Sequence, residues 1–183
     1  MSLPTALGSR WSRADGFTLV ELLVVLSIIG LLAAISMPLY RNSRVRADEA
    51  GAIASLRAIN DAQVAYAQAC GNQRFAPTLV SLGKPMPTTG QAFLSPNLTA
   101  TDPVVHQGYQ LAMGGAPTID ATQSCTGDVP LSAYQVTADP VTPGTSGIRY
   151  FATNADRALF EDTATFVGTM PETGAPPHGS EIK

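Results

Sequence analysis

The sequence is poor in the residues that most enzyme and nucleic-acid-binding sites require. Charged residues make up 14% of the 183 residues and the formal net charge is −3. A nucleic-acid-binding surface needs lysines and arginines clustered on one face, so this balance argues against one. No glycine-rich phosphate loop, HExxH or GxSxG motif occurs, and the two histidines, His106 and His178, are isolated. We therefore expect no enzymatic activity and no cofactor.

Cysteine is equally scarce. The chain has two cysteines, Cys70 and Cys125, and neither belongs to a CxxC pair. This spacing argues against zinc binding and against thioredoxin-like redox chemistry. Glycine and proline are abundant, with 16 and 14 residues, and they concentrate after Cys70. The first third of the chain is therefore expected to be regular, and the rest to be rich in turns.

The longest apolar segment runs from Phe17 to Leu39, with Glu21 as its only formal charge. As a helix it would rise about 35 Å, enough to cross a hydrocarbon core of about 30 Å. A cleaved secretory signal would have a shorter core and a small-residue cleavage site, and Ile35–Pro38 fits such a site badly. A plain membrane anchor explains the length but not the acid. A carboxylate in hydrocarbon costs free energy and marks a functional site.

The residues before this segment suggest a third interpretation. Arg10 and Arg13 are typical of the cytoplasmic side of a membrane span. The following run, Gly16-Phe17-Thr18-Leu19-Val20-Glu21, resembles the class III signal of type IV pilins and type II secretion pseudopilins. The resemblance is close over residues 13–40, looser to Cys70, and only architectural beyond it.

The resemblance implies specific roles for these residues. A prepilin peptidase would remove the leader, residues 1–16, by cutting after Gly16, and would methylate the new amino terminus on Phe17. Glu21 lies four residues further on, one turn along the same helix face, where the helix dipole favours a negative charge. It would pair with the Phe17 amine of a neighbouring subunit. The alternative is a glutamate that extends to the lipid headgroups.

The helix is expected to continue beyond the membrane to Cys70. Residues 17–40 would form its transmembrane and assembly half, and residues 41–70 an amphipathic half with Arg57 and Asp61 outside its apolar face. The residues of this apolar face are Ile53, Leu56, Ile59 and Val64. Pro38 lacks an amide hydrogen and is expected to kink the helix.

The remainder is expected to form a small antiparallel sheet, giving an α+β fold in which the long bent helix packs on three to four strands. Residues 71–107 are expected to be a loop region with one helical turn near Leu79–Leu82, residues 108–167 the sheet, and residues 168–183 a flexible tail. The strand candidates are Tyr109–Met113, Tyr134–Ala138, Ile148–Ala152 and Arg157–Phe160, with a turn at Asn154–Asp156.

The expected topology places both cysteines outside the cytoplasm, where a disulfide is expected. A Cys70–Cys125 bridge would tie the helix end to the region before the second strand, and the alternative is two separate buried thiols. Asp156, Glu161 and Asp162 could approach a calcium ion, as acids do in major pseudopilins. Their spacing does not match an EF-hand loop, so we expect a solvated face and no metal site.

Taken together, these features predict a structural subunit of a type IV pilus with a mechanical function, such as adhesion, twitching motility or DNA uptake. It would be a single-pass inner-membrane protein with a periplasmic globular part, later assembled into a surface pilus. Its partners would be copies of itself, the prepilin peptidase and an inner-membrane assembly platform. The alternatives are a type II secretion pseudopilin and, from a different class, a membrane-anchored binding module that never polymerises.

Overall fold

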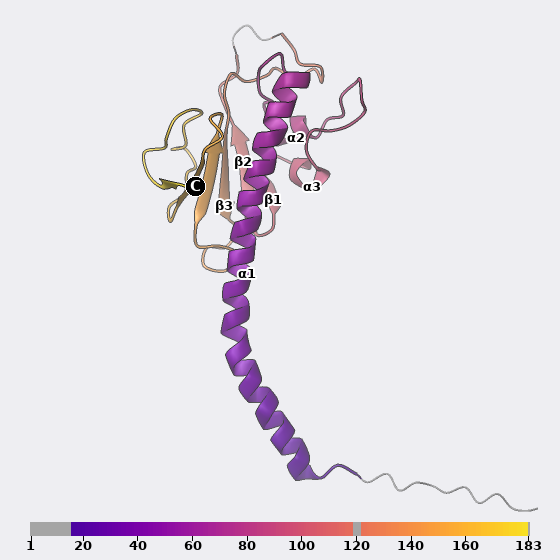
Figure 1. Ribbon diagram of the computed structural model, residues 1–183, viewed down its shortest axis with the longest axis vertical. Coiled ribbons are helices and arrows are strands. Elements are labelled where there is room, and N and C mark those ends of the chain that lie inside the picture. Colours follow the sequence, from indigo (N-terminus) through magenta and orange to yellow (C-terminus); the bar gives the residue numbers. More distant parts are fainter. Residues whose placement is uncertain (1–15, 119–121, 183) are drawn as a thin grey trace, which may run out of the picture. The chain divides into compact units, whose positions relative to one another are not determined.

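The computed structural model describes residues 16–118 and 122–182. The chain divides into two compact units, one ending at Tyr40 and one beginning at Arg41, and each is described by itself. One helix, α1 (Leu19–Ala69), contributes to both units (Figure 1). The expected leader, apart from Gly16, lies outside the described residues.

The first unit contains the apolar part of α1. The large apolar side chains of this part are between 45% and 84% exposed. This helix is long and apolar enough to cross a membrane, by length and composition. Its two serines direct their hydroxyls back into the helix, where Ser27 donates to the carbonyl of Leu23 and Ser36 to that of Leu32, each at 2.8 Å. Both hydroxyls are therefore satisfied without water, as a hydrocarbon environment requires.

Pro38 lies inside α1, near the end of the apolar part. Because proline has no amide hydrogen, the carbonyl of Ala34 receives no hydrogen bond from that position. The helix nevertheless continues to Ala69. The kink expected at Pro38 stays a prediction.

The second unit packs the rest of α1 against one antiparallel sheet, which confirms the α+β class. The sheet has six strands in sequential order, each hydrogen-bonded to the next. The strands are β1 (Val104–His106), β2 (Tyr109–Gly114), β3 (Gln135–Pro140), β4 (Tyr150–Asn154), β5 (Leu159–Asp162) and β6 (Ser180–Glu181). The expectation of three to four strands was therefore too low.

The two additional strands lie at the edges of the sheet, in segments expected to be irregular. β1 falls within the expected loop region, and β6 falls within the expected flexible tail. Both are too short, at three and two residues, to show an alternating pattern. They are strands because β2 and β5 offer free backbone groups to pair with, which no local pattern reveals.

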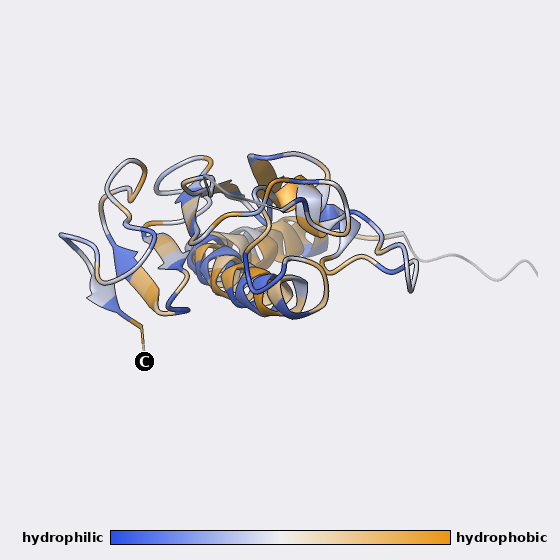
Figure 2. Cartoon of the chain, turned by 90° about the horizontal axis from the view of Figure 1, so that it is seen from above, coloured by the Kyte–Doolittle hydropathy of each residue, from blue (hydrophilic) through white to orange (hydrophobic). Residues whose placement is uncertain are grey.

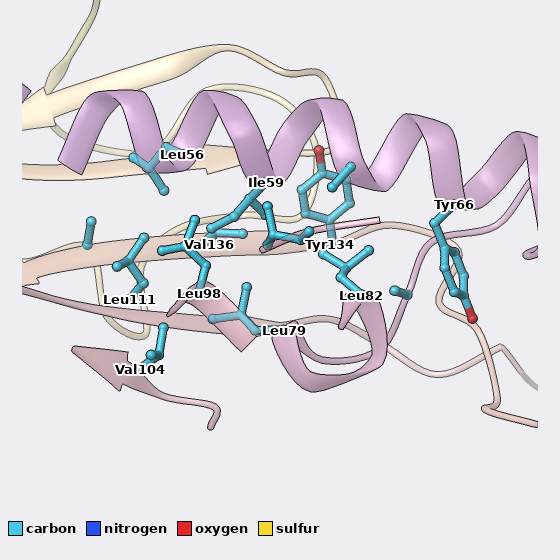
Figure 3. Close-up of a cluster of buried hydrophobic side chains, with 14 of the residues drawn as sticks. Leu56, Ile59, Tyr66, Leu79, Leu82, Leu98, Val104, Leu111, Tyr134 and Val136 are labelled. Carbon is cyan, nitrogen blue, oxygen red and sulfur yellow. The ribbon is translucent and has the colours of Figure 1, made fainter. Parts of the chain in front are cut away.

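The core forms where α1 meets the sheet. Leu56 and Ile59 of α1 are fully buried, as the predicted apolar face requires, whereas Arg57 and Asp61 are exposed. Register aligns four buried residues across β1 to β4, and Figure 3 shows Leu111 and Val104 of this row in the same buried cluster as Leu56. The row is Val104, Leu111, Ala138 and Phe151. Seen from above in Figure 2, hydrophobic and hydrophilic stretches lie side by side on the helix.

Two short helices close the core beside the later turns of α1. They are α2 (Leu79–Leu82), at the position expected for a helical turn, and α3 (Pro96–Thr99). Leu79 and Leu82 are fully buried and Leu98 is 6% exposed. Thr78 caps α2, because its hydroxyl accepts a hydrogen bond from the amide of Ser81.

The outer face of β4 and β5 carries a second, smaller apolar cluster. Phe166 and Met170, which follow β5, are buried against Ala152 and Phe160. His178 lies flat on the Phe166 ring, with the ring centroids 4.9 Å apart. The carboxy-terminal segment therefore covers part of the sheet and is anchored to it.

Two polar side chains of α1 are buried in the core, which the apolar pattern did not indicate. Asn60 donates to Thr153 at 2.9 Å and accepts from the hydroxyl of Tyr134 at 2.9 Å. The side-chain amide of Gln63 accepts a hydrogen bond from the backbone amide of Ala76 at 2.8 Å and donates one to its carbonyl at 3.1 Å. Because each amide has partners on a different segment, the two residues fix the helix against β4 and against the chain after the helix.

An ion pair with a buried carboxylate, between Glu49 and Arg149, fixes the amino-terminal end of the part of α1 in the second unit. Glu49 is 5% exposed, and its carboxylate accepts hydrogen bonds from the backbone amides of Ile148 and Arg149 at 3.0 and 3.2 Å. The Arg149 guanidinium adds two more, at 3.0 and 2.7 Å, and also pairs with Glu161. Burial opposes ionisation of Glu49, but these donors outweigh it and lower its pKa.

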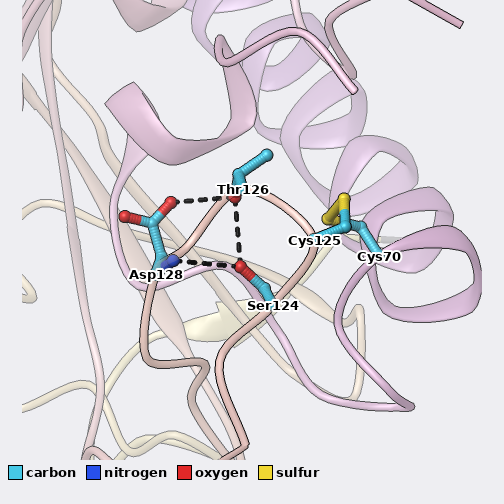
Figure 4. The surroundings of a disulfide bond; sticks show 5 residues. All are labelled: Cys70, Ser124, Cys125, Thr126 and Asp128. Carbon is cyan, nitrogen blue, oxygen red and sulfur yellow. Dashed lines mark hydrogen bonds between the residues drawn. A yellow bond between two sulfur atoms is a disulfide. The ribbon is translucent and has the colours of Figure 1, made fainter. Parts of the chain in front are cut away.

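The disulfide between Cys70 and Cys125 is present, with the two Cα atoms 4.9 Å apart. Figure 4 shows the adjoining turn, in which Ser124, Thr126 and Asp128 hydrogen-bond to one another. Lys84 forms an ion pair with Asp128. The bridge therefore joins the end of α1 to a turn that is itself held together by polar contacts.

Removing this bridge should lower the free energy of unfolding of the second unit by about 4 kcal/mol, because the closed loop of 55 residues restricts the unfolded chain. The measurement is denaturant unfolding of the Cys70→Ser/Cys125→Ser protein beside the oxidised wild type. The same loss should appear when the wild type is unfolded in reductant. Equal midpoints for the oxidised wild type and the double variant would contradict this expectation.

Candidate processing and assembly site

The amino-terminal end of α1 is closed by a reciprocal hydrogen-bond pair between Thr18 and Glu21. The Thr18 hydroxyl accepts from the backbone amide of Glu21 at 3.2 Å. In return, Oε2 of Glu21 accepts from the backbone amide and the hydroxyl of Thr18, at 3.0 and 2.9 Å. This arrangement is a capping box, which satisfies amides that have no partner within the helix.

The capping box explains part of what the sequence left open about Glu21. Its carboxylate is oriented by Thr18 through one oxygen, and among the described residues Oε1 accepts no hydrogen bond. Glu21 can therefore stabilise its own helix and still offer an oxygen to a second donor. The signal is visible in the sequence as T-x-x-E directly before the apolar run, although the sequence analysis did not use it.

Phe17 and Gly16 precede the helix in extended or irregular backbone. Phe17 is 84% exposed, so the Gly16–Phe17 peptide bond is uncovered by the described part of the chain. Gly16 has no neighbouring atom within 4 Å of the position a Cβ would occupy. The bond is thus sterically open to an enzyme that approaches along the chain.

The acids considered for calcium do not converge. Asp156 accepts from the Gly174 amide at 2.6 Å, and Glu161 pairs with Arg149. Asp162 pairs with His178 at 2.7 Å, and this contact lowers the pKa of Asp162. Among the described residues, no group of three or more histidine, cysteine, aspartate or glutamate side chains is arranged to hold a metal ion.

His178 is partly exposed and contacts two side chains that the sequence did not indicate. Its Nδ1 lies 2.7 Å from Asp162, and its Nε2 lies 2.9 Å from the hydroxyl of Thr169. The sequence did not indicate these contacts because Thr169 and Asp162 are distant along the chain. The histidine links the carboxy-terminal segment to the end of β5.

Comparison with known proteins agrees with this amino-terminal site. A family model described as the prokaryotic N-terminal methylation motif matches residues 11–37. The chain is 41% identical over 54 residues to the type IV major pilin protein PilA of Myxococcus xanthus, covering 30% of this chain and 24% of the relative. It is 56% identical over 35 residues to the fimbrial protein EcpB of Eikenella corrodens, covering 19% and 22%.

A fimbrial protein of Pseudomonas aeruginosa is 43% identical over 47 residues, which cover 26% of this chain and 30% of the relative. The chain thus spans about a quarter of the length of the curated relatives it matches. No solved structure matches the chain significantly. The match to the methylation motif and the relatives that share it show that the amino-terminal segment of this chain is similar to that of type IV pilins and fimbrial proteins.

Proposed function

We propose that this chain is a structural subunit of a type IV pilus. It inserts into the inner membrane through α1 with its second unit in the periplasm, and it is cut after Gly16 by a prepilin peptidase and methylated on Phe17. An inner-membrane assembly platform then adds it to a filament of copies of itself. The carrying observation is the apolar part of α1, whose side chains are exposed all around the helix and whose only charge is Glu21.

The physical reason for polymerisation is the apolar surface itself. A helix that is apolar on every side must be enclosed by lipid or by other helices. Lipid is a sufficient partner for the isolated subunit, but it leaves Glu21 without a partner for its charge. In a filament, the free amine of a neighbouring Phe17 supplies that partner, and the pair favours one axial register between subunits.

The names of the curated relatives, type IV major pilin protein and fimbrial protein, favour a pilus over the alternative of a type II secretion pseudopilin. A short periplasmic filament would use the same amino-terminal segment. Electron microscopy of sheared cell surfaces distinguishes the two, since a pilus subunit should appear in filaments released from the cell. Crosslinking between copies at residues 17–40 should detect neighbouring subunits in a pilus and in a pseudopilus. If the chains are strictly monomeric, the remaining alternative is a membrane-anchored binding module that never polymerises.

Replacing Gly16 with leucine should block processing, because a side chain would then occupy the open space beside the bond to be cut. The expected product is the uncut precursor, still carrying residues 1–16 and lacking methylation. Intact mass spectrometry of the membrane fraction measures both changes. Gly8→Leu, within the same leader, is the matched control and should be processed normally.

A mature Gly16→Leu protein with a methylated Phe17 would contradict the proposed cleavage site. A Gly16→Leu protein that is cut and methylated but forms no filament would show that the substitution affects assembly and not cleavage. Cleavage and polymerisation are thus tested by different measurements on the same variant.

A further inference from the structure

The second unit presents an exposed basic and aliphatic surface at the end where α1 enters it. Arg41, Arg44 and Arg46 follow directly after the apolar part of the helix, and all three are exposed. Of these, only Arg44 has an ion-pair partner among the described residues, Asp48 at the long distance of 3.9 Å. The surface therefore carries a net positive charge in a chain whose overall charge is negative.

Helical spacing places one of these arginines on the face of α1 that is buried further along the helix. Val45 is buried within the second unit, and Arg41 lies four residues before it on the same helix face. Glu49, four residues after Val45, binds the loop that joins β3 to β4. Arg41, Val45 and Glu49 therefore form one line, with the arginine at its start and the loop at its end.

The loop adds apolar side chains to the same end of the unit. Ile148 is 61% exposed although both its own amide and that of Arg149 are bound to the Glu49 carboxylate. Val141, at the start of the loop, is 53% exposed, and its amide is bound to the carbonyl of Gly108. Figure 1 shows the strand-connecting loops beside α1 at this end. The backbone contacts hold both aliphatic side chains outward.

We propose that this surface, consisting of Arg41, Arg44, Arg46, Val141 and Ile148, rests on the anionic headgroups of the bilayer before assembly. The inference depends on the proposed membrane insertion but not on polymerisation. Arginines bind lipid phosphates, and aliphatic side chains enter the headgroup boundary. Chain continuity identifies the occupant, because Arg41 is the first residue after the apolar part of α1.

The length of the basic segment matches the headgroup layer. Arg41 to Arg46 span about 8 Å of helix, and the layer is about 5–8 Å thick on each side of the hydrocarbon core.

The test uses the full-length protein reconstituted into phosphatidylcholine vesicles with or without phosphatidylglycerol. Ile148→Trp supplies a fluorescent probe in a Trp11→Phe background, since Trp11 is the only native tryptophan. With phosphatidylglycerol present, its emission should shift to the blue and be quenched by brominated lipid. Substituting all three arginines by glutamine should reduce quenching to the level of the control, Val80→Trp, on α2 beside the far end of the helix.

Flotation with the vesicles checks insertion separately. A protein that floats but whose indole probe at position 148 stays unquenched overturns the docking proposal and leaves insertion intact. Quenching that is equal in both lipid mixtures, or that the three glutamines leave unchanged, also overturns it. A protein that fails to float overturns insertion and docking together. The emission could also shift to the blue only at high protein density and without quenching by lipid. This result would show that the surface contacts a second copy of the chain, and it would likewise overturn the proposal.

Discussion

Replacing Glu21 with alanine should abolish filament formation while leaving cleavage after Gly16 and methylation of Phe17 unchanged. The variant loses the carboxylate that is proposed to bind a neighbouring amine. Removing one partner of a buried ion pair costs about 3–5 kcal/mol. At each subunit interface, about 3 kcal/mol corresponds to a factor of about a hundred in the association constant. Quantitative electron microscopy of sheared filaments, with mass spectrometry of the membrane fraction, measures the two outcomes separately.

The capping box requires a control, because alanine also removes the bonds between Glu21 and Thr18. Loss of a helix cap costs about 1 kcal/mol. Glu21→Gln can still accept from the Thr18 amide but has no charge, so it should fail to assemble as alanine does. Thr18→Ala weakens the capping box and keeps the charge, so it should still form filaments. If Glu21→Gln forms filaments in wild-type yield, the charge of Glu21 is not needed for assembly and its role is limited to capping the helix.

Replacing Glu49 with alanine should cause the largest loss of stability among single substitutions of charged residues in the second unit. The carboxylate is buried and accepts four hydrogen bonds, including two from backbone amides that would be left without partners. Arg149 keeps Glu161 and part of its solvent exposure, so the expected loss is at the lower end for a broken pair, about 3 kcal/mol. Chemical denaturation of the full-length protein in detergent measures it.

Asp61→Ala is the matched control. Asp61 pairs with Arg157 at 3.0 Å, but the side chains are 73% and 54% exposed. Exposed pairs contribute about 0–1 kcal/mol, so this variant should unfold close to the wild type. Similar losses in the two variants would contradict a special role for the Glu49 pair.

The Glu49 pair also predicts a pH dependence. Its pKa is lower in the folded protein than in the unfolded chain, so the unfolded chain binds more protons as the pH falls. The contribution of Glu49 is present above the unfolded pKa of about 4.3, and it is lost as the pH falls through the folded pKa. The stability difference between wild type and Glu49→Ala should therefore shrink on acidification below that range.

Local signals were sufficient for the regular parts of the molecule. The long helix, the turn at Leu79–Leu82 and the strands β2 and β3 lie where hydrophobic periodicity predicted them, and the disulfide is the predicted one. The strands β4 and β5 were predicted within two residues of their observed starts. These elements have patterns of their own, which is why the sequence was enough.

Other features depend on partners that are distant in the sequence. Asn60 and Gln63 are polar residues on a helix face, and they are buried only because Thr153, Tyr134 and Ala76 supply their hydrogen bonds. Glu49 follows Asp48 in a polar stretch of the helix, and nothing local marks it as buried. Its burial depends on Arg149, a hundred residues further along the chain.

Local chemistry and residue order are enough to identify the methylation motif, the membrane-length helix and the acid within it. The size of the sheet, the cover that the carboxy-terminal segment gives it, and the contacts of Glu49, Asn60 and His178 depend on how the chain folds. The physical reason is that edge strands and buried polar groups are stabilised by long-range pairing. The stabilising hydrogen bonds join two segments that are distant in the sequence, so the local pattern of either segment does not reveal them.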